Sequence, residues 1–216
     1  MLRKPEGCAG CPLETCGRGF VPDLIVKDEE YCIFGEAPGS TEIEVGRPFE
    51  GKAGFVLKNW LVKAVPQLQI ALEKQRVSFR NILHCLPPDN KGRPYPSGET
   101  RRGAEEQCKQ YHSDIKASTV ILCGEIAQRF FFGEELEAED ASDRRLGHDL
   151  KGTMGRIGRV YEKDGKRWVF APHPAFILRQ PSLVTHGQAA LRIAAGVDKV
   201  LEPVYMEWNQ AMREIH

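Results

Sequence analysis

Residues 31–39, YCIFGEAPG, decide the fold class of this 216-residue chain. The stretch begins as a short apolar run typical of a buried strand, and Ala37-Pro38-Gly39 is a turn sequence that ends it. Two further runs, 77–84 (VSFRNILH) and 119–123 (TVILC), also predict buried strands. Each strand leads into a loop containing glycine or proline, and α/β folds place their ligand-binding and catalytic residues in such loops.

Helical patterns separate these strands. Residues 53–65 repeat apolar side chains at helical spacing and end before Pro66, and residues 99–116 are polar with a helical composition. Another helix is predicted after Gly124, to about residue 132. This β-α-β-α-β alternation favours a largely parallel sheet covered by helices on both faces.

The C-terminal part of the chain is expected to add a hairpin and a helix. Residues 157–162 and 167–171 flank Asp164-Gly165, a turn pair, and the second arm leads into the loop Pro172-His173-Pro174. A final helix is expected over about 183–200. The acidic stretch 134–143 is interpreted as an exposed insertion and not as a domain boundary.

Charge composition and the N-terminus restrict the function classes. The 30 Lys and Arg residues balance 30 Asp and Glu, so a globally basic nucleic-acid binder is excluded, whereas a local basic groove is not. The N-terminus has no apolar region typical of a secretory signal, and no apolar run is long enough to span a membrane. We therefore expect a reducing, cytoplasmic location, where clustered cysteines bind metal or react more often than they form disulfides.

The seven cysteines differ in context. Cys8 and Cys11 form a C-x-x-C within residues 5–22, a segment that has neither a helical nor a strand period. Cys85 and Cys108 lie far along the chain beside loop and helix elements, where they could converge with the first pair. Four such thiolates could hold zinc or an iron-sulfur cluster. The other three are two small buried strand residues and one spare thiol: Cys32, Cys123 and Cys16.

A glycine-rich stretch follows the first strand. It consists of Gly35 to Gly39, then Glu42, then residues 46–54 (GRPFEGKAG). Backbone N–H groups and the Phe49 ring are expected to surround one concave spot. The spacing matches neither G-x-x-x-x-G-K-[ST] nor G-x-G-x-x-G, so both nucleotide-binding interpretations fail.

Four blocks together resemble the uracil-DNA glycosylase superfamily, specifically the family 4 enzymes that carry a 4Fe-4S cluster. They are CAGCPL (8–13), GEAPGSTEIEVGRPFEGKAG (35–54), RNILHCLPPDN (80–90) and HPAFILRQP (173–181), in the family's order. The resemblance implies one domain over residues 1–216, an α/β/α sandwich of three layers with a mainly parallel, four-stranded central sheet. It also implies that a segment of residues 1–22 helps to bind the cluster, whose ligands are Cys8, Cys11, Cys85 and Cys108.

The function implied by the resemblance is hydrolysis of the N-glycosidic bond of uracil in DNA, which leaves an abasic site for base excision repair. The base must leave the stack, because its glycosidic bond is unreachable inside a duplex. Phe49 is then expected to stack on the flipped uracil, and the Asn81 amide to pair with its edge. His173 is expected to stabilise negative charge at O2 as the base departs.

The remaining roles implied by the resemblance concern the sugar, the water and the loops. Glu36 is expected near the sugar or the water, and Glu42 is expected to pair with Asn90 and brace the loops. Ala37 stands where other branches of the superfamily have a water-activating aspartate, so no side-chain general base can be named.

The loop after His173 carries the expected DNA contacts. Ile177, Leu178 and Arg179 form an apolar wedge followed by a cation, which suits a minor groove with a flipped base. Packing of a helix on the core is the competing interpretation. Weaker candidates for phosphate contacts are Lys52, Arg80, Arg156 and Arg159.

Three alternatives remain open at this stage. The same scaffold could take another deaminated or modified base, or it could be a non-catalytic iron-sulfur DNA-binding protein. A zinc-ribbon interaction module would need only the cysteines.

The expected enzyme is a monofunctional, monomeric glycosylase acting on single- or double-stranded DNA that contains uracil, with no membrane partner. The segment 86–107 is longer than the family pattern.

Overall fold

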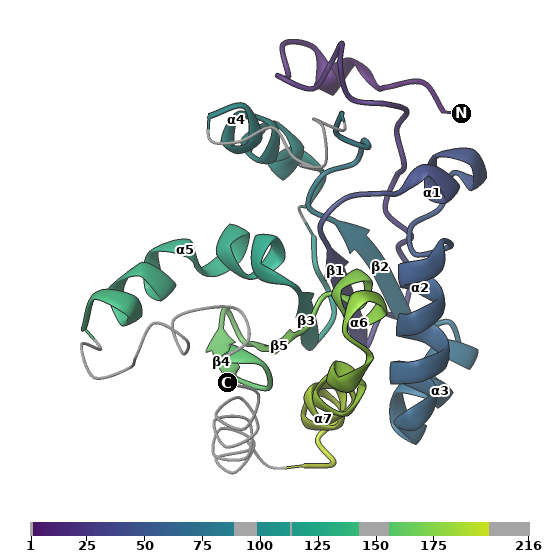
Figure 1. Ribbon diagram of the computed structural model, residues 1–216, viewed down its shortest axis with the longest axis vertical. Helices are drawn as coiled ribbons and strands as arrows, with labels where there is room; N and C mark the ends of the chain where they lie inside the picture. The colour runs from purple at the N-terminus through teal and green to yellow at the C-terminus, as the bar shows by residue number, and fades with distance from the viewer. Residues whose placement is uncertain (1, 89–98, 113, 143–155, 199–216) are drawn as a thin grey trace.

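A computed structural model describes residues 2–88, 99–112, 114–142 and 156–198 of the protein (Figure 1). Its centre is a five-stranded sheet in the order β2-β1-β3-β5-β4. The strands are β1 (Tyr31–Gly35), β2 (Val77–Asn81), β3 (Thr119–Cys123), β4 (Val160–Lys163) and β5 (Lys166–Ala171). All three strands predicted from apolar runs are present, although β2 ends at Asn81 and leaves residues 82–84 to its exit loop.

Four strands are parallel, as the sequence predicts, and the fifth is not. β1 pairs in parallel with β2 and β3, and β3 pairs in parallel with β5. β4 is antiparallel to β5, because the hairpin around Asp164-Gly165 returns the chain to the sheet edge. The expectation of four strands is therefore corrected to five.

The strand register brings the predicted loops together. Gly35 at the end of β1 pairs with Asn81 at the end of β2, and Cys123 at the end of β3 pairs with Ala171 at the end of β5. The carboxyl ends of four parallel strands thus meet at one edge of the sheet, where α/β folds bind ligands.

The helices form two layers. They are α1 (Ser40–Val45), α2 (Lys52–Phe55), α3 (Pro66–Glu73), α4 (Glu99–Cys108), α5 (Glu125–Ser142), α6 (Pro174–Arg179) and α7 (Val184–Ala194). In Figure 1, α2, α3, α6 and α7 lie on one side of the sheet and α5 on the other. Each layer packs on its own core: Ile33 and Ile121 face the first, and Phe34 and Leu122 face the second. This is the expected α/β/α sandwich.

Several predicted helices differ in their bounds from the structure. The predicted helix 99–116 ends as α4 at Cys108, and the helix predicted to about residue 132 runs to Ser142 as α5. The predicted helix 53–65 is α2 followed by a π-helical turn (Val56–Leu61) and a 3-10 turn (Val62–Ala64). Pro66 then occupies the first turn of α3, where its missing N–H costs no helical hydrogen bond. The final helix ends at Ala194, and residues 199–200 of its predicted span lie outside the described residues.

The acidic stretch is part of a helix through Ser142. Helix α5 continues past a non-helical residue, Phe132 (φ −131°, ψ 23°), and Leu136 beyond it is fully buried in the second core. Lys163 on β4 pairs with Glu135 at 2.5 Å. The described acidic side chains of Glu134, Glu135 and Glu137 are exposed, as expected, whereas Leu136 among them is buried; residue 143 lies outside the described residues.

The N-terminal segment follows the edge of the sheet. After a 3-10 turn at Glu6–Cys8, it forms isolated antiparallel bridges, Arg18 with Leu86 and Leu24 with Phe79. The Lys4 ammonium donates to the carbonyl oxygens of Leu13, Glu14 and Gly17 at 2.5, 2.6 and 2.7 Å. Within the described ranges, no helix is both long and apolar enough to cross a membrane.

Candidate functional site

A pocket of about 580 Å³ opens at the carboxyl ends of the strands. Nine of the residues expected to form the site line it: Glu36, Ala37, Glu42, Phe49, Lys52, Asn81, His173, Leu178 and Arg179. They come from loops and helix starts that are separated by up to 143 positions and that the parallel sheet gathers at one edge. Asn90 lies outside the described residues.

Phe49 has a backbone conformation that is unusual for a bulky residue. Its φ is +57°, in the left-handed region, and its ring packs 5.5 Å from that of Phe79. A Cβ on Gly54 would lie 1.9 Å from the Phe49 carbonyl oxygen, so the chain can pass here only with glycine at position 54. The ring therefore packs on the core and also forms a wall of the pocket.

Asn81 ends β2 and is 5% exposed. Within the described part of the chain, its side-chain amide has no hydrogen bond, so a donor and an acceptor remain available to a ligand. A Cβ on Gly35 would lie 2.7 Å from both Asn81 Oδ1 and the Phe49 ring. Glycine at position 35 thus lets an amide and an aromatic ring approach the same small volume.

His173 is the N-cap of α6, directly after β5. Its Nδ1 accepts the backbone N–H of Ala175 at 3.1 Å, which assigns the ring proton to Nε2. Burial, and secondly the charge of Arg179, lower the pKa of His173 to about 4. The imidazole is therefore neutral near pH 7 and carries one N–H donor. A Cβ on Gly124 would lie 2.8 Å from the Cβ of His173, so glycine after β3 makes room for this residue.

The two glutamates of the first loop have different surroundings. Glu42 is buried, and its two oxygens accept the backbone N–H groups of Gly39 at 3.0 Å and Gly51 at 2.6 Å. It thereby ties together two loops that border the pocket; the expected pairing with Asn90 lies outside the described residues. Glu36 is half-buried at the pocket wall, and its carbonyl oxygen accepts the N–H of Leu83.

The expected DNA contacts divide into exposed and buried residues. Leu178 and Arg179 are exposed at the rim, where the Arg179 guanidinium lies 5.6 Å from the Phe176 ring centre, and Lys52 is exposed at the start of α2. Ile177 is buried in the first core, so its expected place in the DNA wedge is wrong. Arg80 and Arg156 are also buried, so the interpretation of these two as phosphate ligands is wrong. A charged side chain inside a fold pairs with other buried groups instead.

The four predicted cluster cysteines line a second, smaller pocket together with Lys4 and Tyr111. Cys85 and Cys108 are buried, whereas Cys8 and Cys11 are partly exposed. Burial raises the pKa of Cys85 to about 11 and that of Cys108 to about 12, and the neighbouring thiols add to both shifts. The bare thiols are therefore protonated at neutral pH, and a metal would displace their protons on binding. Ala37 packs against this site from the other pocket.

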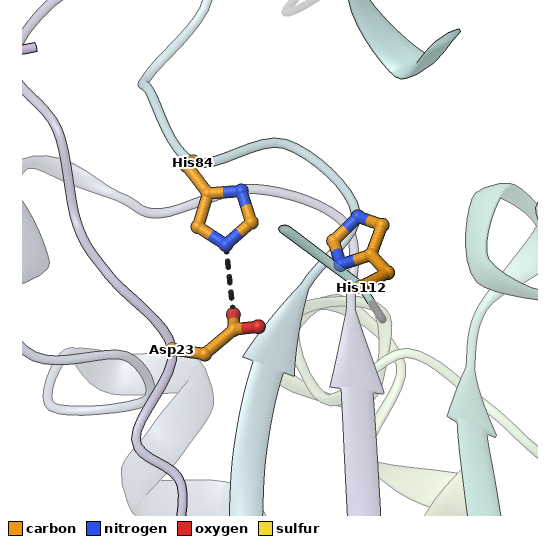
Figure 2. A group of neighbouring side chains, drawn as sticks. All are labelled: Asp23, His84 and His112. Atoms are coloured by element: carbon orange, nitrogen blue, oxygen red, sulfur yellow. Dashed lines mark hydrogen bonds and ion pairs between the residues drawn. The ribbon is translucent and has the colours of Figure 1, made fainter. Parts of the chain in front are cut away.

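A buried polar group beneath the β2 exit loop was not anticipated from the sequence. Figure 2 shows the Asp23 carboxylate directed at the His84 ring, with His112 beside them; His84 Nε2 is 2.9 Å from Asp23 Oδ1. Arg80 faces the other carboxylate oxygen at 3.9 Å and Glu29 at 3.6 Å. The signal available in the sequence was Arg80 itself, a charge within an otherwise apolar strand.

An amide, an aromatic ring and a neutral imidazole N–H in one pocket can bind a planar heterocycle and stabilise negative charge on it. Comparisons with known proteins agree with this chemistry. A sequence model of the Uracil DNA glycosylase superfamily matches residues 22–194. The Type-4 uracil-DNA glycosylase of Sulfurisphaera tokodaii is 34% identical over 82% of this chain and 73% of its own length. That of Saccharolobus solfataricus is 32% identical over 95% and 82%, and that of Pyrobaculum aerophilum 29% over 92% and 94%. This chain therefore belongs to the uracil DNA glycosylase superfamily.

Proposed function

We propose that this protein is a monofunctional glycosylase that hydrolyses the N-glycosidic bond of uracil in DNA and leaves an abasic site. The observation that carries the proposal is the meeting of the Asn81 amide, the Phe49 ring and the neutral His173 imidazole in one pocket. The family relationship and the names of the relatives support the same activity.

Recognition of the base rests on Phe49 and Asn81. The flipped uracil stacks on the Phe49 ring, and the Asn81 amide donates to O4 and accepts from the N3–H. Cytosine presents the opposite pattern at this edge, with an amino group at position 4 and an acceptor at N3. Pairing it would leave the buried amide unsatisfied, which costs more than a missing contact in an open site.

Bond cleavage is assisted by stabilisation of the departing base. The neutral Nε2–H of His173 donates to O2, where negative charge accumulates as the C1′–N bond breaks. Positive charge on the sugar is stabilised by the DNA phosphates and by Glu36. Ala37 offers no proton acceptor, so Glu36 and backbone carbonyl groups position the water. Glu42 acts indirectly, by holding the loops that carry Gly39 and Gly51.

The cysteine site suits a 4Fe-4S cluster better than a single zinc ion. Among the described residues, no three cysteine sulfurs lie within 4.8 Å of one another. Zn–S bonds of 2.3 Å in a tetrahedron would place the sulfurs about 3.8 Å apart. We assign Cys8, Cys11, Cys85 and Cys108 as the ligands. The bound cluster would supply a covalent cross-link between the N-terminal segment, the β2 exit loop and α4.

Contacts to DNA follow from the rim of the pocket. Leu178 fills the space left by the flipped base, while Arg179 and Lys52 bind phosphates on either side. The substrate is single- or double-stranded DNA that contains uracil, bound by a monomer in the compartment that holds the DNA. Residues 1–216 act as one catalytic domain.

The test uses protein purified under anaerobic conditions. Single- and double-stranded oligonucleotides carrying one uracil, hypoxanthine, xanthine or thymine mismatch are incubated with it, and alkali reveals the abasic sites. We expect cleavage at uracil, reduced about 10²-fold or more by His173→Ala and by Asn81→Ala. Asn59→Ala, which alters an amide on the π-helical turn that is not among the residues lining the pocket, is the matched control and should cleave normally.

The other outcomes separate the alternatives. Cleavage at a different base alone would retain the scaffold and contradict the substrate. A protein that contains the cluster and binds DNA but cleaves none of these oligonucleotides would instead be a non-catalytic DNA-binding protein.

A further inference from the structure

Asp23 is a buried carboxylate that lies between the two pockets. It lies in the stretch between residue 22, where the cysteine-containing segment ends, and β1, and its side chain is 5% exposed. Oδ1 lies 2.9 Å from His84 Nε2 and 3.4 Å from the backbone nitrogen of Asn81. Because a carboxylate only accepts hydrogen bonds, both of these groups are donors to it. Oδ2 faces the Arg80 guanidinium at 3.9 Å.

His84 connects this carboxylate to the cysteine site. It directly precedes Cys85, and its backbone N–H interacts with the Cys108 thiol. Its ring lies between Phe20 and His112, with centroid distances of 5.5 and 5.3 Å, and meets the edge of Tyr111. The Tyr111 hydroxyl is 3.7 Å from Cys8 Sγ. The His84 ring is therefore fixed by groups that themselves contact the cysteines.

A metal ion is the competing interpretation of this cluster. One ligand atom each from Asp23, His84 and His112 lies within 4.8 Å of the others. Two observations argue against a cation here. The first is that Arg80 already places a full positive charge 3.9 Å from Asp23, and the second is that the same guanidinium lies 3.6 Å from Glu29, so the buried carboxylates here already have a cationic partner. A second cation beside the guanidinium would be repelled in this buried environment.

We propose that Asp23 is a positioning residue that holds Asn81, the amide proposed to pair with uracil, in register with the cysteine site. The inference rests on the proposed function. Asp23 lines neither pocket; it receives the Asn81 N–H on one side and the His84 ring on the other. A displacement of Asn81 by a fraction of an ångström weakens its pairing with the base without changing which groups are present.

A double-mutant cycle tests the inference. Single-turnover excision of uracil is measured for Asp23→Ala, Asn81→Ala and the double variant, with Asp28→Ala as the control because Asp28 is an exposed carboxylate of the same segment. We expect Asp23→Ala to lower the rate about tenfold in the wild-type background and less than about twofold in the Asn81→Ala background. His84→Phe, which keeps the ring contacts, should lower it about threefold. Iron and sulfide content should stay at the wild-type level in all variants.

Amide hydrogen exchange gives a readout that does not depend on activity. Exchange in a peptide covering residues 77–83 should be faster in Asp23→Ala than in Asp28→Ala. Equal exchange in these two variants would overturn the inference, even if the wild-type protein excises no uracil, an outcome that would contradict the proposed function separately. Rate losses that multiply across the cycle, or iron lost from Asp23→Ala alone, would show that Asp23 does not act through Asn81. One equivalent of zinc that disappears in Asp23→Ala and in His112→Ala would establish the metal site instead.

Discussion

At the level of single residues, the pocket sets the protonation state of His173. The ring is desolvated, the Ala175 N–H occupies its Nδ1, and the Arg179 cation opposes a second proton. A neutral N–H donor suits the proposed role, because the imidazole can stabilise the anionic base through a hydrogen bond while keeping its own proton. Glycine is also needed at position 124, because a side chain there would collide with the Cβ of His173.

The pH dependence of excision follows from this state. With the pKa of His173 near 4, the single-turnover rate of uracil excision should be nearly constant from pH 8 to about pH 5.5 and should fall as the pH approaches 4. The rate is measured in a series of buffers at constant ionic strength. An increase in rate as the pH falls from 7 to 5.5 would show that the imidazolium form is the active one.

The free energy of unfolding should also depend on pH through the lowered pKa of His173. The folded pKa lies below the ordinary value of about 6.5, so the unfolded state binds more protons between these values and stability rises with pH across that window. The stabilising effect is complete above about pH 6.5 and is lost as the pH falls toward 4. Urea unfolding at pH 7 and 4.5 should show a smaller pH effect for His173→Gln than for the wild type. His112, whose pKa is also lowered to about 4, contributes equally to both proteins.

At the level of elements, the loop from Gly46 to Gly54 is held by close backbone packing. Phe49 adopts a positive φ, a conformation that costs free energy and persists only where the surroundings enforce it. The enforcing contacts are Gly54 against the Phe49 carbonyl and Glu42 against the Gly51 N–H. The loop is thus a preorganised wall and not an adaptable one.

Gly54→Ala tests this packing. The added Cβ would overlap the Phe49 carbonyl oxygen at 1.9 Å, so we expect a loss of about 3 kcal/mol or more in unfolding free energy, together with reduced excision. Gly133→Ala is the matched control: its Cβ would meet nothing within 4 Å, and alanine favours the helix, so stability should stay equal or rise. Equal stability of the two variants in urea unfolding would contradict the backbone contact.

The second half of α5 gives an element-level prediction of its own. Leu136 is fully buried among the aromatic residues of the second core, although acidic residues surround it in sequence. Leu136→Ala should lower the unfolding free energy by about 2–5 kcal/mol, whereas Glu134→Ala on the exposed side of the same helix should change it by less than about 0.5 kcal/mol. Two small effects in urea titrations would instead indicate an unpacked insertion.

At the level of the whole molecule, the cysteine site joins three distant parts of the chain. Cys8 and Cys11 come from the N-terminal segment, Cys85 follows β2 and Cys108 ends α4. The surrounding core is small, with Leu13, Leu83 and Ala104 as its main aliphatic members. Such a small core supplies little stability by itself, and small cores of this kind depend on a metal or another cross-link.

Loss of one ligand should therefore loosen the whole N-terminal end. Cys108→Ser is expected to lose iron and acid-labile sulfide, lower Tm by several degrees and expose residues 5–22 to protease. Cys16→Ser, an exposed thiol outside the proposed ligand set, should keep the iron and the Tm of the wild type. Iron content and thermal unfolding measure both. Full iron in Cys108→Ser would contradict the assignment of this ligand.

The local patterns that predicted elements correctly were those with one dominant physical cause. The short apolar runs within 31–36 and 119–123 are typical of buried strands, and both form them. Asp164-Gly165 supplies the left-handed turn that a tight hairpin needs. Sequence reasoning failed where packing overrides residue type. Arg80 and Ile177 were expected at the DNA-facing surface, yet both are fully buried.

The α/β class, the largely parallel strands and the two buried strand cysteines could be predicted from the amino-acid sequence, because each depends on a local pattern, and the family resemblance supplied nine residues that line the pocket. Tertiary packing was needed to reveal that Arg80 and Arg156 are buried, that Glu42 binds two backbone N–H groups, and that Asp23 reaches both His84 and Asn81. These facts depend on which distant segments the sheet brings together, and hydrogen bonds between groups up to 61 positions apart leave no periodic signal in the chain.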